Sequence, residues 1–249
     1  MLDDRKQIIS WSLYDWANST FSTTVMAGFF PIFFQQYWST ATDVTVSTWY
    51  LGLANSLASI AVASLAPFLG AIADKASVKK RLLIFFAFIG IISTGALSMV
   101  GQGYWKIAAV FYVVASVGFM SANIFYDSLL PSVASKQKRD FVSSLGYSLG
   151  YIGGGILFLV NVAMYLKPQF FGIADAPSAI KLSFLTVAVW WAIFTLPILI
   201  FVKEKAPAND IGIIKSISAG WIQLLSTLKR IRELKVVTTF LIAYWLYID

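Results

Sequence analysis

The sequence predicts an all-α protein that crosses a membrane several times. Hydrophobic residues make up 58% of the 249 positions, charged residues make up only 12%, and several apolar runs are long enough to form membrane-spanning helices. A soluble domain carries about 25% charged residues and would not cover its surface with this composition. A helix of about 20 apolar residues spans the hydrocarbon layer of a bilayer. We therefore expect a polytopic membrane protein whose surroundings are the lipid bilayer.

Six apolar spans can be placed along the chain, each long enough for one helical crossing. They cover residues 12–38, 47–73, 82–102, 105–130, 141–166 and 180–202. A seventh span begins near Lys235 and rises only about 21 Å before Asp249. The expected parts are a six-helix bundle (1–202), a linker with a basic amphipathic helix (203–234) and the start of a seventh helix (235–249). We therefore expect a piece of a longer protein, without its C-terminal half.

Basic residues are distributed unevenly between the two sides of the predicted spans. Sixteen of the 19 lysines and arginines fall at the N-terminus or in the loops after spans two, four and six. Only Lys106, Lys167 and Lys181 fall on the other side. Because cytoplasmic loops carry the excess of basic residues, we expect a cytoplasmic N-terminus. Topology thus accounts for the net charge of +7, and we expect no nucleic-acid partner.

The residue content excludes several classes of enzyme and metal site. The chain contains no cysteine and no histidine. This removes Ser-His-Asp triads, histidine-ligated zinc and thiolate chemistry together. We expect a protein that is not an enzyme, with no catalytic residues, no metal and no cofactor. The enzyme alternative that stays open is an intramembrane hydrolase with Asp15 and Asp127 as its acid pair.

Polar side chains follow one face of the first span and one face of the fourth. The first stripe comprises Asp15, Asn18, Ser19 and Ser22, and the second comprises Ser116, Asn123 and Asp127. Charged groups at membrane depth face the interior of a bundle or an aqueous path, because exposure to lipid costs several kcal/mol. We expect the two stripes to face each other and to line a path for a small-molecule substrate or an ion. Two alternatives stay open: the stripes serve only as hydrogen-bonded helix contacts, or Asp127 is solvated at the headgroups.

A short pattern recurs in spans one, four and seven. It reads Leu13-Tyr14-Asp15, then Phe125-Tyr126-Asp127, then Leu246-Tyr247-Ile248-Asp249. These spans are the first helices of successive three-helix units, as expected for a transporter built from repeats. We therefore add Tyr14, Tyr126 and Asp249 to the predicted path.

Glycines in the fifth span and at the end of the second predict close helix contacts. Gly146, Gly150 and Gly154 recur at four-residue steps, which lets a neighbouring helix approach. The stretch "GAIADKASVKKR" resembles the loop signature of the major facilitator superfamily, Gly-x-x-x-Asp-Arg/Lys-x-Gly-Arg-Arg/Lys, with Ser77 and Val78 as departures. Its predicted gating residues are Gly70, Asp74, Lys75, Lys79 and Lys80. In this interpretation Gly70 makes a close contact and Asp74 is a latch between transport states, although topology alone also explains the lysines.

Three stretches together resemble one family within that superfamily. "WSLYDWANSTFSTTVMAGFFPIFF", "LGAIADKASVKKR" and "FLIAYWLYID" are similar to the vacuole-effluxer-like (autophagy-related permease) family. The resemblance covers nearly the whole chain. It implies the N-terminal six-helix bundle of a major facilitator fold, plus an incomplete seventh helix, in a plasma (inner) or vacuole-type membrane. Fungal members of the family are associated with amino-acid efflux.

The resemblance therefore predicts a secondary active transporter that works by alternating access. Its expected substrate is a small polar solute such as an amino acid. Proton coupling through Asp15 or Asp249 is a further expectation, because a carboxylate at membrane depth can bind and release a proton. The alternative function is a non-transporting membrane fragment or scaffold that lacks the second bundle.

Overall fold

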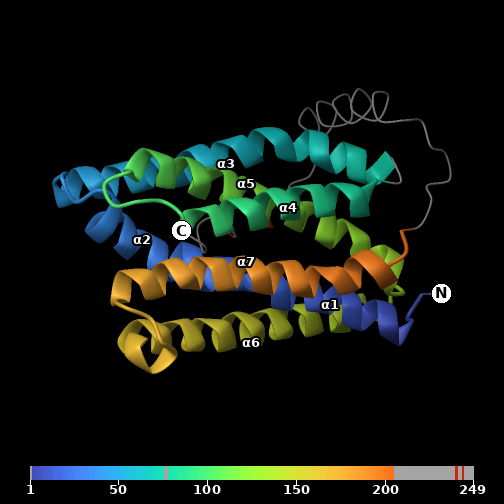
Figure 1. Cartoon of the computed structure of the whole chain (residues 1–249). Helices are drawn as coiled ribbons and strands as arrows, with labels where there is room; N and C mark the ends of the chain where they lie inside the picture. Colours follow the sequence, from blue (N-terminus) through green and yellow to red (C-terminus); the bar gives the residue numbers. More distant parts are fainter. Residues whose placement is uncertain (1, 76–77, 205–238, 241–242, 244–249) are drawn as a thin grey trace.

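The computed structural model describes residues 2–75, 78–204, 239–240 and 243, with the backbone alone from 71 to 75. Every regular element within these residues is helical, and the long helices lie side by side in one bundle (Figure 1). The all-α class is confirmed. Most of the predicted linker and of the seventh span, including Asp249, lies outside the described residues.

The first apolar segment is one continuous helical run whose hydrogen-bond register changes along its length. Its parts are α1 (Arg5–Thr20), η1 (Phe21–Phe29), α2 (Phe30–Phe33) and η2 (Phe34–Trp38). The run begins before the predicted start at residue 12, because Asp4 caps it by accepting a hydrogen bond from the Gln7 N–H at 2.9 Å. η1 and η2 have the wider turns of a π-helix, so the Phe30 N–H donates to the carbonyl of Val25, five residues back.

The other predicted spans correspond to five long helices. They are α3 (Val44–Lys75), α4 (Lys79–Leu97), α5 (Trp105–Val133), α6 (Arg139–Leu166) and α7 (Ala176–Phe201), with the short η3 (Pro168–Phe171) between the last two. Each of the five is long and apolar enough to cross a membrane. α4 packs along α5, while α1 packs against α6 and α7. Their bounds differ from the predicted ones by a few residues, which is the usual uncertainty of helix ends.

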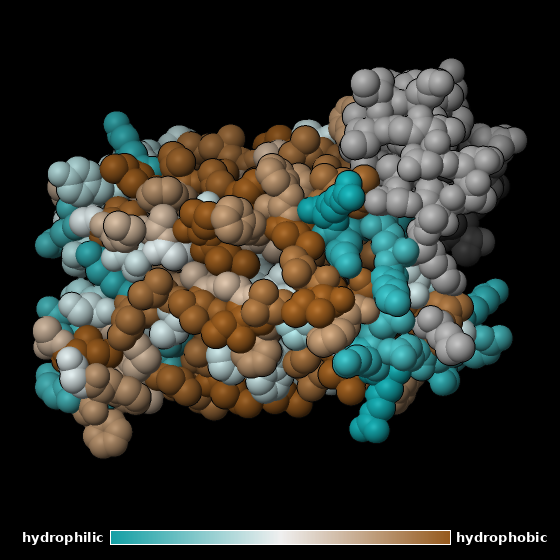
Figure 2. All heavy atoms as spheres, turned by 45° about the vertical axis from the view of Figure 1, so that its right-hand side comes forward, coloured by the Kyte–Doolittle hydropathy of each residue, from teal (hydrophilic) through white to brown (hydrophobic). Residues whose placement is uncertain are grey.

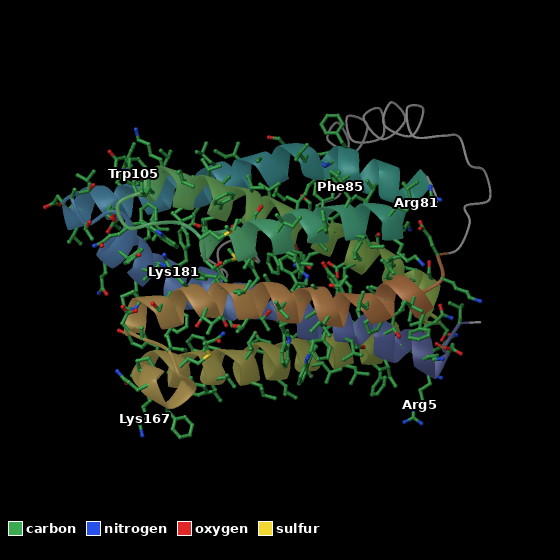
Figure 3. All side chains as sticks on the ribbon, viewed as in Figure 1. Arg5, Arg81, Phe85, Trp105, Lys167 and Lys181 are labelled. Carbon is green, nitrogen blue, oxygen red and sulfur yellow. The ribbon has the colours of Figure 1, made fainter. Side chains whose placement is uncertain are left out.

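The outer surface of the bundle matches a membrane protein. On the face shown in Figure 2, hydrophobic side chains form a broad band across the middle, and hydrophilic ones gather toward the two ends. Arg5 and Arg81 lie at one end, here named the basic end, and Lys167 and Lys181 lie at the opposite end (Figure 3). The loops that the sequence places on one side thus meet at one end of the structure.

The opposite end is held together by stacked aromatic rings. Phe30 stacks on Tyr112 of α5 with ring centroids 3.9 Å apart, and Trp38 stacks on Phe184 of α7 at 5.8 Å. Both Phe30 and Trp38 are completely buried. Burying aromatic side chains and pairing their rings both stabilise a helix interface. These contacts join the end of the first segment to α5 and α7.

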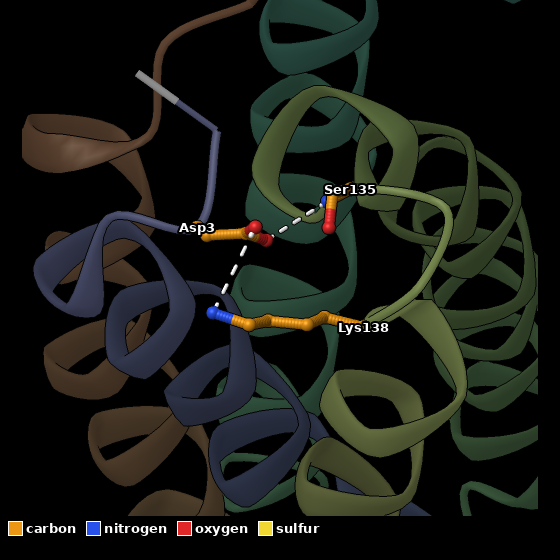
Figure 4. A network of polar contacts seen from close by, with 3 residues as sticks. All are labelled: Asp3, Ser135 and Lys138. Atoms are coloured by element: carbon orange, nitrogen blue, oxygen red, sulfur yellow. Dashed lines mark hydrogen bonds and ion pairs between the residues drawn. The ribbon is translucent and has the colours of Figure 1, made fainter.

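The basic end adds polar contacts to backbone groups to the packing of buried side chains such as Val133 and Val202. The Asp3 N–H donates to the carbonyl of Val133 at 2.9 Å, and the Ser135 N–H donates to the Asp3 carboxylate at 2.9 Å (Figure 4). The Lys138 ammonium lies 3.8 Å from the same carboxylate. The backbone hydrogen bond from Ser135 holds the pKa of Asp3 below its ordinary value, with a smaller effect from Lys138. The N-terminus is therefore clamped to the turn between α5 and α6.

Candidate solute-binding site

A cavity of about 240 Å³ lies where α1, η1, α5 and α6 meet. Its lining residues are Asp15, Asn18, Ser19, Ser22, Thr23, Phe119, Asn123, Tyr147, Gly150 and Tyr151. The polar stripes predicted on spans one and four therefore contribute to one shared cavity. The fifth span, for which the sequence predicted only packing, supplies a third wall.

Two amides link the predicted stripes directly. The Asn18 amide of α1 donates a hydrogen bond to the Asn123 side-chain oxygen of α5, and Asn18 is only 1% exposed. An amide buried among apolar helices needs such a partner, because a polar group without one is costly there. The bond fixes which side of α1 faces α5. With α1 in this orientation about its axis, Asp15 and Ser22 face the cavity.

Asp15 is partly buried at the wall between α1 and α6. Ser19, one turn further along α1, donates a hydrogen bond to the Asp15 Oδ1 atom at 3.2 Å. Gly150 of α6 passes directly over this pair: a methyl group there would lie 2.6 Å from Ser19 Oγ and 3.1 Å from Asp15 Oδ1. The absence of a side chain at Gly150 is therefore what allows α6 to approach the carboxylate.

The same close approach continues along α6. A methyl group at Gly146 would lie 2.7 Å from the Tyr126 hydroxyl, and one at Gly154 would lie 3.0 Å from Thr23 Oγ1. Gly153, which sequence reasoning did not single out, is equally confined, at 2.6 Å from the Trp16 ring. Small residues of this kind let two membrane helices approach each other closely. The three predicted glycines thus lie at the interface of α6 with the first segment and α5.

Sequence reasoning missed the tyrosines of α6. Tyr147 and Tyr151 line the cavity, and each side chain is 64% exposed. Their hydroxyls are 3.2 Å apart and their rings meet edge to face, with centroids 4.9 Å apart. The available signal was their four-residue spacing, which places both on one face of α6 next to Gly150.

Three other predicted path residues do not line the cavity. Tyr14 is completely buried, and Tyr126 is buried with its ring stacked on Trp11 at 4.2 Å. The two tyrosine rings lie 5.2 Å apart, between α1 and α5. Asp127 is exposed, one turn beyond Asn123 toward the basic end. The repeated Tyr-Asp pattern therefore places its tyrosines in helix packing, and its two described acids in different surroundings.

The predicted gating residues are only partly described. The side chains of Asp74 and Lys75 lie outside the described residues. At Gly70 no described atom lies within 4 Å of where a methyl group would be, so Gly70 makes no close helix contact with the described residues.

Lys79 and Lys80 meet a residue that sequence reasoning missed. Their N–H groups donate to the two oxygens of Glu204 at 2.9 and 3.2 Å, so a carboxylate that follows α7 caps the start of α4. The Lys80 ammonium also donates to the carbonyl of Val202 at 2.9 Å. The role of Glu204 could not be predicted from the sequence, because Glu204 is distant from α4 along the chain and belongs to no motif.

The cavity has the chemistry of a binding site for a small polar solute. It offers one carboxylate, two amides, several hydroxyls and aromatic rings, and none of its lining residues is basic. Within the described residues no cluster of histidine, cysteine, aspartate or glutamate could hold a metal ion. The cavity is suited to a small solute, because pockets for drug-sized ligands have volumes of about 300 Å³ or more.

Comparison with known proteins reveals relatives in bacteria and fungi. The MFS-type transporter YxiO of Bacillus subtilis is 37% identical over 98% of this chain and 57% of its own length. A protein of Aquifex aeolicus is 28% identical over 74% of this chain and 45% of its own length. Autophagy-related protein 22 of Saccharomyces cerevisiae is 25% identical over 69% of this chain and 39% of its own length. No solved structure matches.

The chain spans about half or less of the length of the curated relatives that it matches: 57%, 45% and 39% for these three. The sequence profile described as "Vacuole effluxer Atg22 like" matches residues 3–140 and 133–249, which together cover almost all of the chain. The resemblance predicted from the three sequence stretches is thereby confirmed, and so is the multi-pass helical architecture. The chain belongs to the vacuole effluxer Atg22-like family.

Proposed function

We propose that the full-length protein is a secondary active transporter that moves a small polar solute, such as an amino acid, by alternating access. The observation that carries this proposal is the shared cavity, where stripes from α1 and α5 place Asp15, Asn18 and Asn123 around one space. Charged and amide groups inside a membrane bundle mark substrate and ion pathways. The names of the relatives, an MFS-type transporter and a vacuole effluxer family, favour the same class.

A second bundle is part of this proposal. The described lining comes from α1, η1, α5 and α6 alone, and Tyr147 and Tyr151 remain largely exposed beside the cavity. Transporters of this architecture place the substrate between two halves of the protein. We propose that a C-terminal half covers this side and completes the path. The positive-inside distribution further supports a cytoplasmic location for the basic end, and for the N-terminus with it.

Asp15 is the proposed proton-coupling residue. Its neighbours bearing titratable groups include Tyr14 of α1 and Asp127 and Tyr126 of α5, which interact with it electrostatically. Tyr147 and Tyr151 of α6 share its cavity. No described basic side chain forms an ion pair with it. A carboxylate in this position can bind a proton on one side of the membrane and release it on the other.

Uptake by proteoliposomes that contain the full-length protein tests the proposal. An inward proton gradient should drive accumulation of a labelled amino-acid mixture, and Asp15→Asn should abolish the gradient-driven part. Asp140→Asn removes an exposed carboxylate at the start of α6, outside the cavity, and should leave uptake unchanged. Gradient-driven uptake that survives in a folded Asp15→Asn variant would exclude the coupling role.

A membrane scaffold without transport activity is the competing function. Under that alternative, Asn18, Asn123 and the α6 glycines only hold helices together. Substitution of Asn123 by alanine should then change stability and nothing else. Loss of uptake by an Asn123→Ala protein that melts within a few degrees of the unchanged protein would favour transport instead.

A further inference from the structure

We propose that Asp15, Tyr147 and Tyr151 form a subsite for a positively charged ammonium group, so that the solute carries an amine. This inference rests on the proposed transport function and names the chemistry that the N-terminal half recognises. It is carried by the geometry of one carboxylate and two aromatic rings around the same cavity.

The charge of the cavity is unbalanced in the described structure. Asp15 is the only charged residue among the described lining residues. The described residues form one salt bridge, between Lys138 and Asp3, and it lies outside the cavity. When it carries no proton, a carboxylate at membrane depth is stabilised by a counter-charge, because it is otherwise poorly solvated. A cationic solute group supplies that charge, whereas an anionic group would meet repulsion.

The carboxylate also lines the cavity and is only partly buried. Ser19 donates to Asp15 Oδ1, and α6 packs closely over that oxygen at Gly150, so access comes from the cavity. The side chains that flank this glycine on the cavity face are Tyr147 and Tyr151. The ammonium group can therefore reach the carboxylate from the cavity, beside the two rings that line it.

The tyrosine pair adds a second attraction for cations. An ammonium group within about 6 Å of an aromatic ring centroid is attracted by the negative face of the ring, most strongly where water is excluded. The rings of Tyr147 and Tyr151 are held edge to face by their own contact, 4.9 Å between centroids. Phe119 contributes a third ring on the α5 side of the cavity. Carboxylate and rings together favour an amine over a neutral polar group of the same size.

A matched set of four probes separates the contributing groups. Alanine carries both charges, ethylamine has only the amine, propionate has only the carboxylate, and N-acetylalanine blocks the amine. Binding to the purified full-length protein is measured by isothermal titration and by the thermal shift. We expect alanine and ethylamine to bind at least about tenfold more tightly than propionate and N-acetylalanine.

Variants assign the preference to the proposed residues. Asp15→Asn should reduce amine binding about tenfold or more, and Asp140→Asn should leave it unchanged. Tyr151→Phe keeps the ring and should bind ethylamine within about threefold, whereas Tyr151→Leu should lose about tenfold. Tyr104→Leu, at a tyrosine with similar exposure outside the cavity, is the matched control. Propionate binding as tight as ethylamine, no binding by any probe, or an unchanged Asp15→Asn variant would overturn the subsite.

Uptake measured in parallel keeps the two proposals apart. Amine-selective binding without accumulation of any probe in proteoliposomes would contradict transport and support the subsite. Accumulation of probes without selectivity for the amine would contradict the subsite and support transport.

Discussion

The two ends of the bundle are held together by different kinds of contact. At the opposite end, buried rings such as Trp38 and Phe184 stack between the first segment and its neighbours. At the basic end, Asp3 and Glu204 bind backbone groups of other helices and turns. A buried ring contributes several kcal/mol, while a partly exposed polar contact contributes about 1 kcal/mol or less. Separating the helices at the basic end should therefore cost less free energy than separating them at the opposite end. The polar cavity lies between the two ends.

The largest expected effect comes from the aromatic end. Trp38→Ala removes a completely buried ring that contacts Phe30, Phe33 and Phe184, and should reduce the free energy of unfolding by about 3–5 kcal/mol. Trp49→Ala removes a ring that is 62% exposed on α3 and should cost far less. Denaturant unfolding in detergent micelles measures both. Equal losses of unfolding free energy in the two variants would contradict the conclusion that the aromatic end is the more stable one.

The next effect tests the close approach of α6 beneath the cavity. Gly146→Ala inserts a methyl group 2.7 Å from the Tyr126 hydroxyl and 2.8 Å from the Trp11 ring, and should cost about 1–3 kcal/mol. Gly155→Ala is the matched control on the same helix, because no described atom of another element lies within 4 Å of its added methyl group. That control should be neutral or slightly stabilising, since alanine favours helix more than glycine does. A Gly146→Ala variant as stable as the control would show that the helices can separate freely.

Glu204 provides the test of the basic end. Glu204→Ala leaves the Lys79 and Lys80 N–H groups without their cap and should cost about 0.5–2 kcal/mol. Amide hydrogen exchange at the start of α4 should accelerate, while exchange in α5 near Tyr112 stays slow. Glu204→Gln keeps an acceptor oxygen, so its stability should lie between that of Glu204→Ala and that of the unchanged protein. Uniform acceleration throughout the bundle would mean that the ends do not separate independently.

The sequence predicts the helices of this molecule better than the contacts between residues that are distant along the chain. The spans were predictable because apolar length alone specifies a membrane helix. The polar stripes, such as Asp15 with Asn18, predicted which sides of α1 and α5 face the bundle interior. The Gly146 series located the interface of α6 in the same way. These signals are local and periodic, so one sequence contains them in full.

What the sequence could not reveal depends on contacts between distant residues. Glu204 lies 125 positions from Lys79, and no spacing rule connects them. The four-residue spacing of Tyr147 and Tyr151 places them on one face of α6, but it does not assign them to a cavity, since a tyrosine at the membrane surface is ordinary. The tyrosines of the repeated Tyr-Asp pattern were assigned to the path, but the structure places Tyr14 and Tyr126 in packing. Sequence repetition identified corresponding positions and did not distinguish lining from packing.

A smaller effect sharpens the description of the cavity itself. A double-mutant cycle between Asn18→Ala and Asn123→Ala should give a coupling energy of about 0.6 kcal/mol, the usual value for hydrogen bonds between membrane helices. If the amides also line a solute path, uptake should fall much further than this coupling alone explains. Uptake that decreases only in proportion to stability would assign the pair to helix contact.

The smallest expected effect is a pH-dependent one at the N-terminal clamp. The pKa of Asp3 is held below its ordinary value of 3.8, so its ionised form stabilises the folded state above that pH, and the contribution is lost as the pH falls through the lowered pKa. Asp3→Asn should lower the melting temperature slightly at neutral pH, and the difference should disappear in acid. Asparagine tolerates the left-handed backbone of this residue (φ 63°), so the change isolates the charge. A difference that instead grows in acid would show that the clamp does not depend on the carboxylate, and the basic end would then be held by Glu204 and its neighbours alone.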